Sequence, residues 1–268
     1  MFKIFNLHFT DCCNFQCKCC FVKKSARFLS LEKTKIVIDK ISSYFKLKNI
    51  NDGRINIAGG EPLTSSYIQE IIDYIISKNI RVSIITNGFL LTDDFIKNNK
   101  GKLEMIGISI DSIIPSTNLL LGRCQGNATF EYNRLVHLCK LIKENNIFCK
   151  INIVVSKINY HEDIKKLLDD VKPDRFKILQ MLPTNEFAIS QKITVEDYSK
   201  YLEKYDGYNY VAESFDKISN AYVIIDSEGK ISTNNLHDGS FDVLEGEIAD
   251  FEHLIDFNQE NESIRYIK

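Results

Sequence analysis

The chain has 268 residues, of which 44% are hydrophobic and 26% charged, and its formal net charge is -2. This composition is typical of a soluble globular protein that is large enough to bury a core. The near-zero charge gives no general attraction to nucleic acid or anionic membrane, so an anion site must be a local cluster. No apolar run reaches the length of a membrane span, and no signal peptide fits before the first predicted strand. We therefore expect a cytoplasmic protein with neither nucleic acid nor membrane as a partner.

Apolar, β-branched runs alternate with segments of helical periodicity through the first two thirds of the chain. The predicted strands are 4–10, 54–58, 81–86, 105–110, 148–155 and 175–181, and the predicted helices are 30–45, 66–78, 92–99, 129–145 and 161–171. Residues 111–126 are predicted to form a long loop. Each return between parallel strands needs a crossover, usually a helix. We therefore predict an α/β fold, a partial (βα)6 TIM-like barrel over residues 1–185.

The pattern changes in residues 186–268, which we predict to be a C-terminal extension. It contains a predicted helix at 195–205, a hairpin of 222–226 with 230–233 around Glu228-Gly229, and an acidic helix at 247–256. No linker of Pro, Gly or Ser separates it from the rest. We therefore expect one compact domain in which the extension closes the gap of an open six-stranded barrel.

The polar residues of interest follow the predicted strands. In parallel barrels the chemistry lies at the carboxyl ends of the strands. Residues 59–62 (Gly-Gly-Glu-Pro), 86–88 (Thr-Asn-Gly) and 109–112 (Ser-Ile-Asp-Ser) occupy such positions. Any one of these alone is ordinary turn punctuation. Together with the cysteines after the first strand, they indicate a site on one rim.

Five of the eight cysteines lie within nine residues after the first predicted strand, and Cys13, Cys17 and Cys20 form a C-x3-C-x2-C triplet. Three thiolates on one loop can bind three irons of a 4Fe-4S cluster and leave the fourth iron open. A structural zinc site is the alternative, with His8, Cys12 or Cys19 as the fourth ligand. The scattered positions of Cys124, Cys139 and Cys149 in apolar segments argue against a disulfide framework.

The triplet after the first strand, combined with Gly59-Gly60-Glu61-Pro62 after the second, resembles the radical S-adenosylmethionine (SAM) superfamily. The resemblance implies a 4Fe-4S cluster whose open iron is chelated by SAM, and a 5′-deoxyadenosyl radical that abstracts hydrogen. It also implies a low-potential electron donor of the flavodoxin or ferredoxin type. The residues that it implies for SAM binding are Phe21, Gly59, Gly60, Glu61, Pro62, Thr86 and Asn87, with Ser109 and Arg123 on the carboxylate.

Further segments are similar to viperin and its prokaryotic relatives, in the order of that family and over roughly residues 4–235. These are 6–8 (Asn-Leu-His), 122–126 (Gly-Arg-Cys-Gln-Gly), 150–152 (Lys-Ile-Asn), 175–180, 213–214 (Glu-Ser) and 222–226. Those enzymes dehydrate a ribonucleoside triphosphate to its 3′-deoxy-3′,4′-didehydro analogue, a chain terminator, and the prokaryotic members act in defence against phage. The resemblance therefore implies a SAM-dependent nucleotide dehydratase.

Polar residues spaced two apart on three predicted strands share a face of each strand. The pairs are residues 54 and 56, 150 and 152, and 175 and 177. Any one pair is as consistent with a solvated outer face of the barrel. Three pairs on barrel strands favour a polar lumen that binds a polyanion. By resemblance the residues that hold the substrate are Asn6, Arg54, Asn56, Lys150, Asn152, Arg175, Lys177, Glu213 and Ser214. Asn6 meets the base, and its amide suits either cytosine or uracil by exchanging its donor and acceptor ends; we favour CTP over UTP and GTP.

Tyr222 is the candidate catalytic residue, a proton or hydrogen donor, from its Tyr-x-x-x-Asp context; a buried core tyrosine is the alternative. The sequence also departs from the viperin pattern. Ala58 replaces the usual Ser, Arg54 stands at a Lys-like position, and the membrane-binding helix of the animal enzyme has no counterpart. Two other functions stay open: a radical SAM enzyme that matures a peptide or cofactor, disfavoured because no Cys follows Cys149, and a zinc-stabilised binding module.

Overall fold

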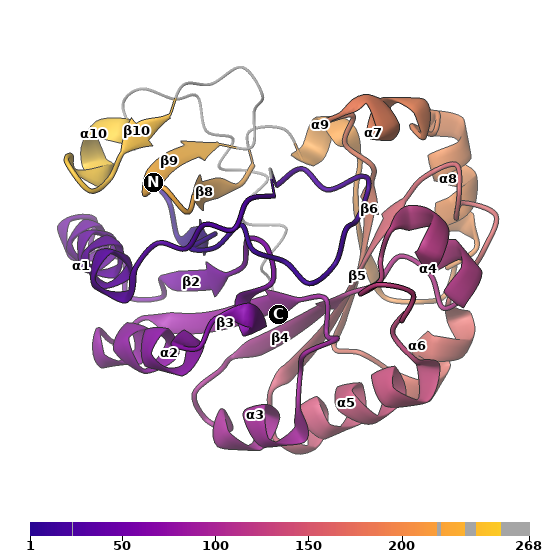
Figure 1. Ribbon diagram of the computed structural model, residues 1–268, viewed down its shortest axis with the longest axis horizontal. Helices are drawn as coiled ribbons and strands as arrows, with labels where there is room; N and C mark the ends of the chain where they lie inside the picture. The colour runs from indigo at the N-terminus through magenta and orange to yellow at the C-terminus, as the bar shows by residue number, and fades with distance from the viewer. Residues whose placement is uncertain (23, 219–220, 234–239, 253–268) are drawn as a thin grey trace.

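The computed structural model describes residues 1–22, 24–218, 221–233 and 240–252. Within these residues one curved sheet has the strand order β10-β9-β8-β1-β2-β3-β4-β5-β6-β7 (Figure 1). All neighbours from β8 to β7 are parallel, and β9 and β10 are antiparallel. The strands are β1 (Ile4–Leu7), β2 (Arg54–Ile57), β3 (Arg81–Thr86), β4 (Met105–Ser109), β5 (Phe148–Val155), β6 (Arg175–Gln180), β7 (Tyr210–Glu213), β8 (Val223–Ile225), β9 (Lys230–Thr233) and β10 (Phe241–Asp242).

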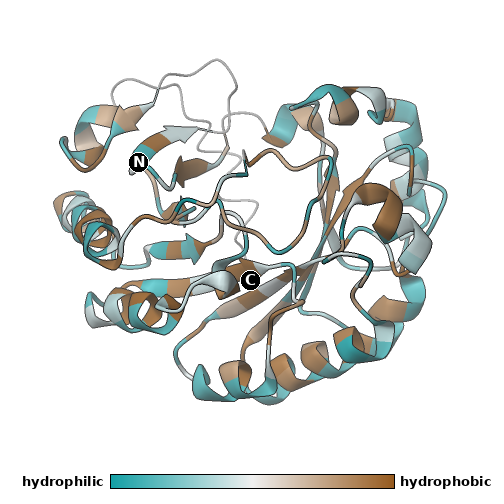
Figure 2. Ribbon diagram, viewed as in Figure 1, coloured by the Kyte–Doolittle hydropathy of each residue, from teal (hydrophilic) through white to brown (hydrophobic). Residues whose placement is uncertain are grey.

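Helices cover the outer face of this sheet, and their hydrophobic sides face it (Figure 2). Residues such as Ile55, Ile84 and Ile151 point outward from the strands into this core and are fully buried. The helices are α1 (Leu31–Leu47), the 3-10 turn η1 (Pro62–Thr64), α2 (Ile68–Ser77), α3 (Asp93–Asn98), α4 (Pro115–Leu121), α5 (Tyr132–Glu144), α6 (Lys165–Val171), α7 (Glu186–Ser190), α8 (Val195–Glu203), α9 (Phe215–Ile218) and α10 (Ile248–Glu252).

The strand register places polar residues on the inner face, in the lumen of the partial barrel. Asn6 pairs with Asn56, and Asn56 pairs with Ser83. On the other side of the lumen, Asn152 pairs with Lys177. Because side chains alternate across a strand, these polar residues share the face opposite the isoleucine core.

The predicted α/β fold and partial barrel are confirmed, and all six predicted strands are present. The prediction of a long loop at 111–126 is wrong, because Pro115 begins α4, a short helix that ends at Leu121 before the left-handed Gly122. The predicted helix at 161–171 begins later, at Lys165. The acidic helix is α10; residues 253–256 of its predicted range lie outside the described residues.

The C-terminal extension contributes strands to both sides of the parallel run. β7 extends it beyond β6, and β8 joins it beside β1, forming the predicted hairpin with β9. We expected the extension to close the barrel, but within the described residues no backbone pairing joins β7 to β8, so the sheet stays open. The division at residue 185 stays a prediction.

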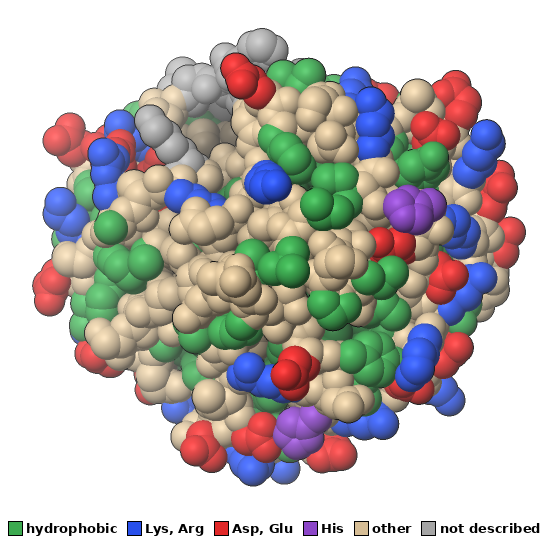
Figure 3. All heavy atoms as spheres, turned by 45° about the vertical axis from the view of Figure 1, so that its right-hand side comes forward, with side chains coloured by type: hydrophobic (Ala, Val, Ile, Leu, Met, Phe, Trp, Pro, Cys, Tyr) green, Lys and Arg blue, Asp and Glu red, His purple; other side chains and the backbone are tan. Residues whose placement is uncertain are grey.

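The outer surface carries charges of both signs. On the face shown in Figure 3, basic and acidic side chains are interspersed along the right-hand and lower edges, with apolar side chains between them. Among the helices of the described residues, none has the length and apolarity that a membrane crossing requires.

One buried side chain joins the carboxyl ends of β4 and β5. The Asn159 amide nitrogen donates to the carbonyls of Asp111 (2.7 Å) and Val154 (3.0 Å). Its Oδ1 accepts from the backbone nitrogen (2.8 Å) and hydroxyl (3.0 Å) of Ser156. Because all of these groups are away from water, Asn159 fixes this part of the rim.

Asn159→Ala should lower the free energy of unfolding by about 2–3 kcal/mol, because it leaves several buried polar groups without partners. Urea denaturation followed by far-UV circular dichroism measures this loss. Asn98→Ala, at an exposed position of α3, is the control and should change stability by less than about 0.5 kcal/mol. Equal stability of the two variants would contradict the role given to Asn159.

Candidate functional site

The cysteine loop after β1 lies directly against the glycines after β2. Gly60 N donates to Thr10 O (2.7 Å), and Glu61 N donates to Cys12 O (2.7 Å). A Cβ on Gly60 would collide with the Cys12 carbonyl, and one on Gly59, whose φ is 118°, would collide with Thr10 O. Gly-Gly is therefore required here for close backbone approach and for a positive φ.

Two other parts of the chain hold the same loop. On one side, Lys18 N donates to Leu121 O (2.9 Å) at the end of α4, where Gly122 packs on the Gln16 carbonyl. On the other side, the Asp11 carboxylate accepts hydrogen bonds from the hydroxyls of Ser25 (3.0 Å) and Ser227 (2.8 Å). Ser227 belongs to the turn between β8 and β9, so the extension contributes to the site.

The thiols of Cys13, Cys17 and Cys20 are half-buried on this loop, and all eight cysteines are free. Burial raises the pKa of Cys13 to about 11, and burial raises that of Cys17 against the opposing charge of Arg123. Cys19, a candidate fourth ligand in the alternative zinc site, lies beside Cys17 and Cys20, and burial raises its pKa to about 12. Bound iron would shift these thiols to thiolates, the form that ligates metal.

Hydrogen-bond donors already point at the sulfurs. Phe15 N donates to Cys13 Sγ (3.4 Å), Asn87 Nδ2 lies 3.9 Å from the same sulfur, and Arg123 Nη1 lies 3.9 Å from Cys17 Sγ. Such donors stabilise the negative sulfurs of an iron–sulfur cluster and tune its potential. Within the described residues, no three His, Cys, Asp or Glu side chains converge on one point as ligands of a single ion do. Three free thiols on one loop, with N–H donors directed at two of the sulfurs, fit a 4Fe-4S cluster, in which each thiolate would bind a different iron.

Glu61 ties the ends of β2 and β3 together. Its carboxylate is fully buried and accepts hydrogen bonds from Thr86 Oγ1 (2.6 Å), Asn87 N (2.7 Å) and Leu63 N (3.2 Å). Burial raises the pKa of Glu61, and these donors oppose the rise. Pro62 begins η1 directly behind it. The predicted SAM residues from Gly59 to Asn87 are thus brought together at one rim, next to the cysteine loop.

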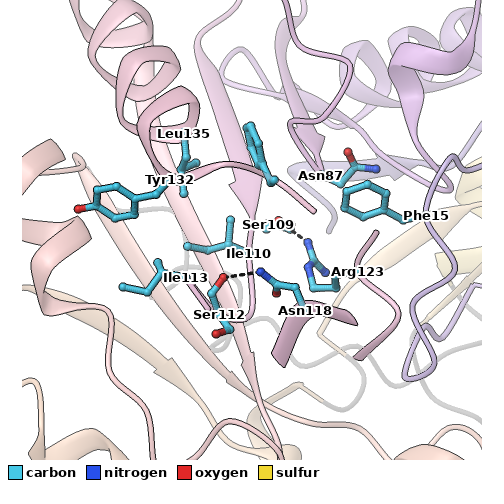
Figure 4. A pocket seen from close by; sticks show the side chains of 11 residues that line it. Phe15, Asn87, Ser109, Ile110, Ser112, Ile113, Asn118, Arg123, Tyr132 and Leu135 are labelled. Atoms are coloured by element: carbon cyan, nitrogen blue, oxygen red, sulfur yellow. Dashed lines mark hydrogen bonds between the residues drawn. The ribbon is translucent and has the colours of Figure 1, made fainter. Parts of the chain in front are cut away.

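Arg123 contacts Ser109, but through the backbone carbonyl of Ser109 and not through its side chain. Arg123 Nη2 donates to the backbone carbonyl of Ser109, and Nη1 donates to Asp111 Oδ2 (3.0 Å). Asp111 Oδ1 in turn accepts from Val154 N (2.9 Å), which anchors the arginine to β5. A small pocket beside this group is shown in Figure 4; it is lined by Phe15, Asn87, Ser109, Ile110, Ser112, Ile113, Asn118, Arg123, Phe130, Tyr132 and Leu135.

Phe21 follows the last ligand cysteine and is more than half exposed. Its ring centroid lies 5.9 Å from that of His8, at the top of β1. Burial lowers the pKa of His8 to about 4, so the imidazole is neutral at physiological pH. The exposed ring of Phe21, beside His8, is available to cover the flat or apolar part of a ligand.

Cationic side chains from β5 and β6 line one side of the lumen. Lys150 is buried, and burial together with the charges of Lys177 and two arginines lowers its pKa well below the usual value, although the charge of Glu213 opposes the shift. Its ammonium has no ion-pair partner among the described residues. Arg175 stacks over Phe148, with its guanidinium carbon 5.4 Å from the ring centroid. An anion bound here would relieve this mutual repulsion.

Lys177, Glu213 and Tyr222 form a buried group that spans the open side of the sheet. Lys177 Nζ lies 2.6 Å from Glu213 Oε1, and the exposed fractions of the two side chains are 7% and 2%. Tyr222 donates to Glu213 Oε2 (2.6 Å), and Lys177 donates to the Tyr222 hydroxyl. Glu213 ends β7 and Tyr222 precedes β8, so these side chains join the two strands that the backbone leaves apart.

The opposite side of the lumen carries uncharged amides. Asn56 Nδ2 donates to Asn6 Oδ1 (3.0 Å). Near them, the charge of Arg54 is paired with Glu104 at 3.3 Å.

Asn152 is buried on β5, and its Oδ1 has no hydrogen-bond partner in the described structure. Ser214 begins the turn into α9, where its carbonyl accepts from Ile218 N (3.1 Å).

Two residues that position this site were not predicted for it. Asp111 orients Arg123, and Ser83 donates to Asn56 in the lumen. Asp111 lay within the polar segment noted after the fourth predicted strand, so its position was a usable signal. The sequence gives no comparable signal for Ser83, because a serine within an apolar strand does not reveal its hydrogen-bond partner.

The chain matches the family model of the radical SAM superfamily over residues 7–171. It is 31% identical over 249 residues to the S-adenosylmethionine-dependent nucleotide dehydratase of Flammeovirga pacifica, covering 85% of this chain and 81% of that protein. It is 32% identical over 254 residues to the enzyme of that name from Lacinutrix mariniflava, covering 90% of this chain. The chain spans about half (52%) of that second relative.

Solved structures share the fold. Streptococcus suis SuiB bound to S-adenosylmethionine superposes with a TM-score of 0.73 at 18% identity, covering 99% of this chain and 68% of that one. The chain named native anSMEcpe with bound AdoMet superposes with a TM-score of 0.70 at 14% identity, covering 97% of this chain and 82% of that one. The match to the family model over residues 7–171 and the 31% identity to the Flammeovirga pacifica enzyme show that the chain belongs to the radical SAM superfamily and, within it, to the S-adenosylmethionine-dependent nucleotide dehydratases.

Proposed function

We propose that this enzyme dehydrates a ribonucleoside triphosphate, with CTP favoured over UTP and GTP, to the 3′-deoxy-3′,4′-didehydro analogue. The observation that carries the proposal is the buried Lys150, which pairs in register with Arg175, next to the Lys177 position of the same strand, and makes no ion pair within the described residues. A triphosphate brings several negative charges, which require cations when they are removed from water. Lys150, Arg175 and Lys177 supply them on one side of the lumen.

The residues of the rim hold the cofactors. Cys13, Cys17 and Cys20 bind the cluster, while Gly59 to Pro62, Thr86, Asn87, Phe21, Ser109 and Arg123 surround SAM. Bound together, the cluster and SAM supply a carbon-centred radical that abstracts hydrogen, here from C4′ of the ribose. The protein positions the ribose, through the phosphates, and keeps water out of the lumen.

Loss of the 3′ hydroxyl as water needs a proton, which the group of Lys177, Glu213 and Tyr222 is arranged to deliver. The Tyr222 hydroxyl touches both a buried ammonium and a buried carboxylate. A proton donated by Tyr222 is replaced from Lys177, while Glu213 holds both donors in place. Completing the alkene then takes one electron from the low-potential donor and no further proton, because the C4′ radical, one proton and one electron together give the alkene and one water.

Several broader features belong to the same proposal. The product, which lacks a 3′ hydroxyl, terminates polymerase chains, and its use is antiviral, against phage. Free cysteines and a nucleotide substrate fit the cytoplasm, where thiols stay reduced. The electron donor is a low-potential protein of the flavodoxin or ferredoxin type.

Anaerobic incubation of the reconstituted enzyme with SAM, reductant and each of CTP, UTP and GTP tests the reaction. We expect one nucleotide to stimulate 5′-deoxyadenosine formation and to lose one water, as measured by chromatography and mass spectrometry. A Cys17→Ala variant is the negative control, since it lacks a cluster ligand. Deoxyadenosine formation that no nucleotide stimulates contradicts the proposal.

Lys150→Met should raise the nucleotide KM by at least about tenfold, because a charge-assisted contact to phosphate is lost. Since the pKa of Lys150 is depressed in the free protein and phosphate favours the ammonium, wild-type KM should also rise as pH increases above that pKa. Steady-state kinetics over a series of pH values below the ordinary lysine pKa of about 10.4 measure both effects.

In the Lys150→Met variant, KM should rise less with increasing pH than in the wild type, because no lysine at position 150 loses its charge. Lys140→Met, on the exposed face of α5, is the matched control and should leave KM unchanged. A KM for Lys150→Met that equals the wild-type value would place this lysine outside the nucleotide site.

Tyr222→Phe should lower the amount of dehydrated nucleotide formed per 5′-deoxyadenosine by about tenfold or more, because general acid assistance is lost. Quantifying both products in the same reaction gives the ratio. Tyr208→Phe, near the sheet's outer side where its hydroxyl contacts Asp169, is the control. An unchanged ratio for Tyr222→Phe would assign Tyr222 to packing alone.

A further inference from the structure

The outer side of the cysteine loop lies between two short helices that both bond to one of its residues. Lys18 N donates to the Leu121 carbonyl at the end of α4 (2.9 Å). Asn185 Nδ2, at the N-cap of α7, donates to the Lys18 carbonyl (3.0 Å). Because Cys17 and Cys19 flank Lys18 in the chain, the surface formed by α4, Lys18 and α7 borders the loop that carries the thiols.

This surface is apolar. The exposed fractions of Leu119 and Leu120 on α4 are 42% and 59%, and that of Ile189 on α7 is 60%. Residues 112–130, which include α4, contain a single charged side chain, Arg123, although 26% of the whole chain is charged. In Figure 3 the charged side chains gather mainly toward the edges of the face, and its middle is filled largely by apolar and uncharged groups. Exposed apolar surface of this kind, rimmed by charge, is typical of a protein contact.

One exposed cation stands in this surface. The Lys18 side chain leans toward α7, where its ammonium lies 5.5 Å from the ring centroid of Phe187. α4 has no charged residue, and α7 has one, Glu186, in its first turn. A partner that presents acidic groups around an apolar centre complements this arrangement.

The surface also lies close to the site in a chemical sense. α4 ends two residues before Arg123, whose Nη1 lies 3.9 Å from Cys17 Sγ. The proposed reaction needs two electrons for each product, one to cleave SAM and one to complete the alkene. The second electron arrives while the nucleotide still occupies the lumen, so its route begins outside the barrel. Because electron transfer slows steeply with distance, the donor has to approach the outer side of the cysteine loop.

We propose, on the basis of the dehydratase function above, that the surface of Lys18, Leu119, Leu120 and Ile189 is the docking site of a small acidic electron-transfer protein. In each encounter the donor is oxidised by one electron and the cluster is reduced by one, so two encounters serve each product. Interfaces of this transient kind are small, below about 1,200 Å². A few apolar side chains therefore hold the partner, and the lysine steers its approach.

Leu120→Glu and Lys18→Glu test the surface in the reconstituted holoenzyme, because each places a negative charge where an acidic partner approaches. Oxidised flavodoxin and oxidised ferredoxin are the two probes, and biolayer interferometry at low ionic strength measures their binding. At least one of them should bind the wild-type enzyme, and its Kd should rise by about tenfold or more in each variant. Stopped-flow mixing with the same protein in its reduced form should show slower bleaching of the cluster by a similar factor.

Dithionite separates docking from damage, because a small reductant needs no protein surface. It should reduce the cluster of both variants at the wild-type rate. Ile36→Glu, on α1, changes an apolar side chain of comparable exposure (45%) and is the matched control. This variant should bind the donor and accept its electrons as the wild type does.

Wild-type binding and wild-type bleaching in Leu120→Glu would overturn the proposal, and so would an equal slowing of the reaction with dithionite. A wild-type holoenzyme that binds neither probe has the same consequence. A wild-type dimer that Leu120→Glu dissociates in size-exclusion chromatography would instead assign this face to a second copy of the chain. Failure of the dehydratase function looks different: no nucleotide is dehydrated, while donor binding and its loss in Leu120→Glu persist.

Discussion

Close contact between two stretches of backbone is the constraint on which this site depends. The carbonyls of Thr10 and Cys12 receive hydrogen bonds from Gly60 and Glu61, at a separation that leaves no room for a Cβ on either glycine. The contact fixes the cysteine loop relative to β2, and Glu61 then fixes β2 relative to β3. The thiols of the loop and the rim formed by the ends of β2 and β3 thereby acquire one geometry without any bound cofactor.

A second constraint concerns the open side of the sheet. Backbone pairing within the described residues ends at β7 and β8, and Tyr222 crosses the opening through its hydrogen bonds with Glu213 and Lys177. A wall made of side chains can carry charge and exchange protons, which a wall of paired strands cannot. The proposed proton donor is therefore also part of the structure that encloses the substrate.

The sequence predicted the repeating fold well because alternating and helical periodicities are strong local signals. It also placed the cysteine triplet and Gly-Gly-Glu-Pro correctly at strand ends, since glycine and cysteine spacing carries direct chemical meaning. It missed α4, whose seven residues include Pro115, Ser116 and Thr117 and give little periodicity. It also missed the pairing of Lys177 with Glu213, because partners 36 positions apart on different strands leave no local pattern.

The hydrogen bond between Asp11 and Ser227 joins residues 216 positions apart in the chain. The cysteine loop is thus buttressed by a turn that the ribosome makes only when most of the polypeptide has been synthesised. Until that turn arrives, the five thiols of the loop lack part of their support. The full set of contacts around the cysteine loop therefore exists only in a chain that extends at least to residue 227, and a shorter chain would hold the same thiols less firmly.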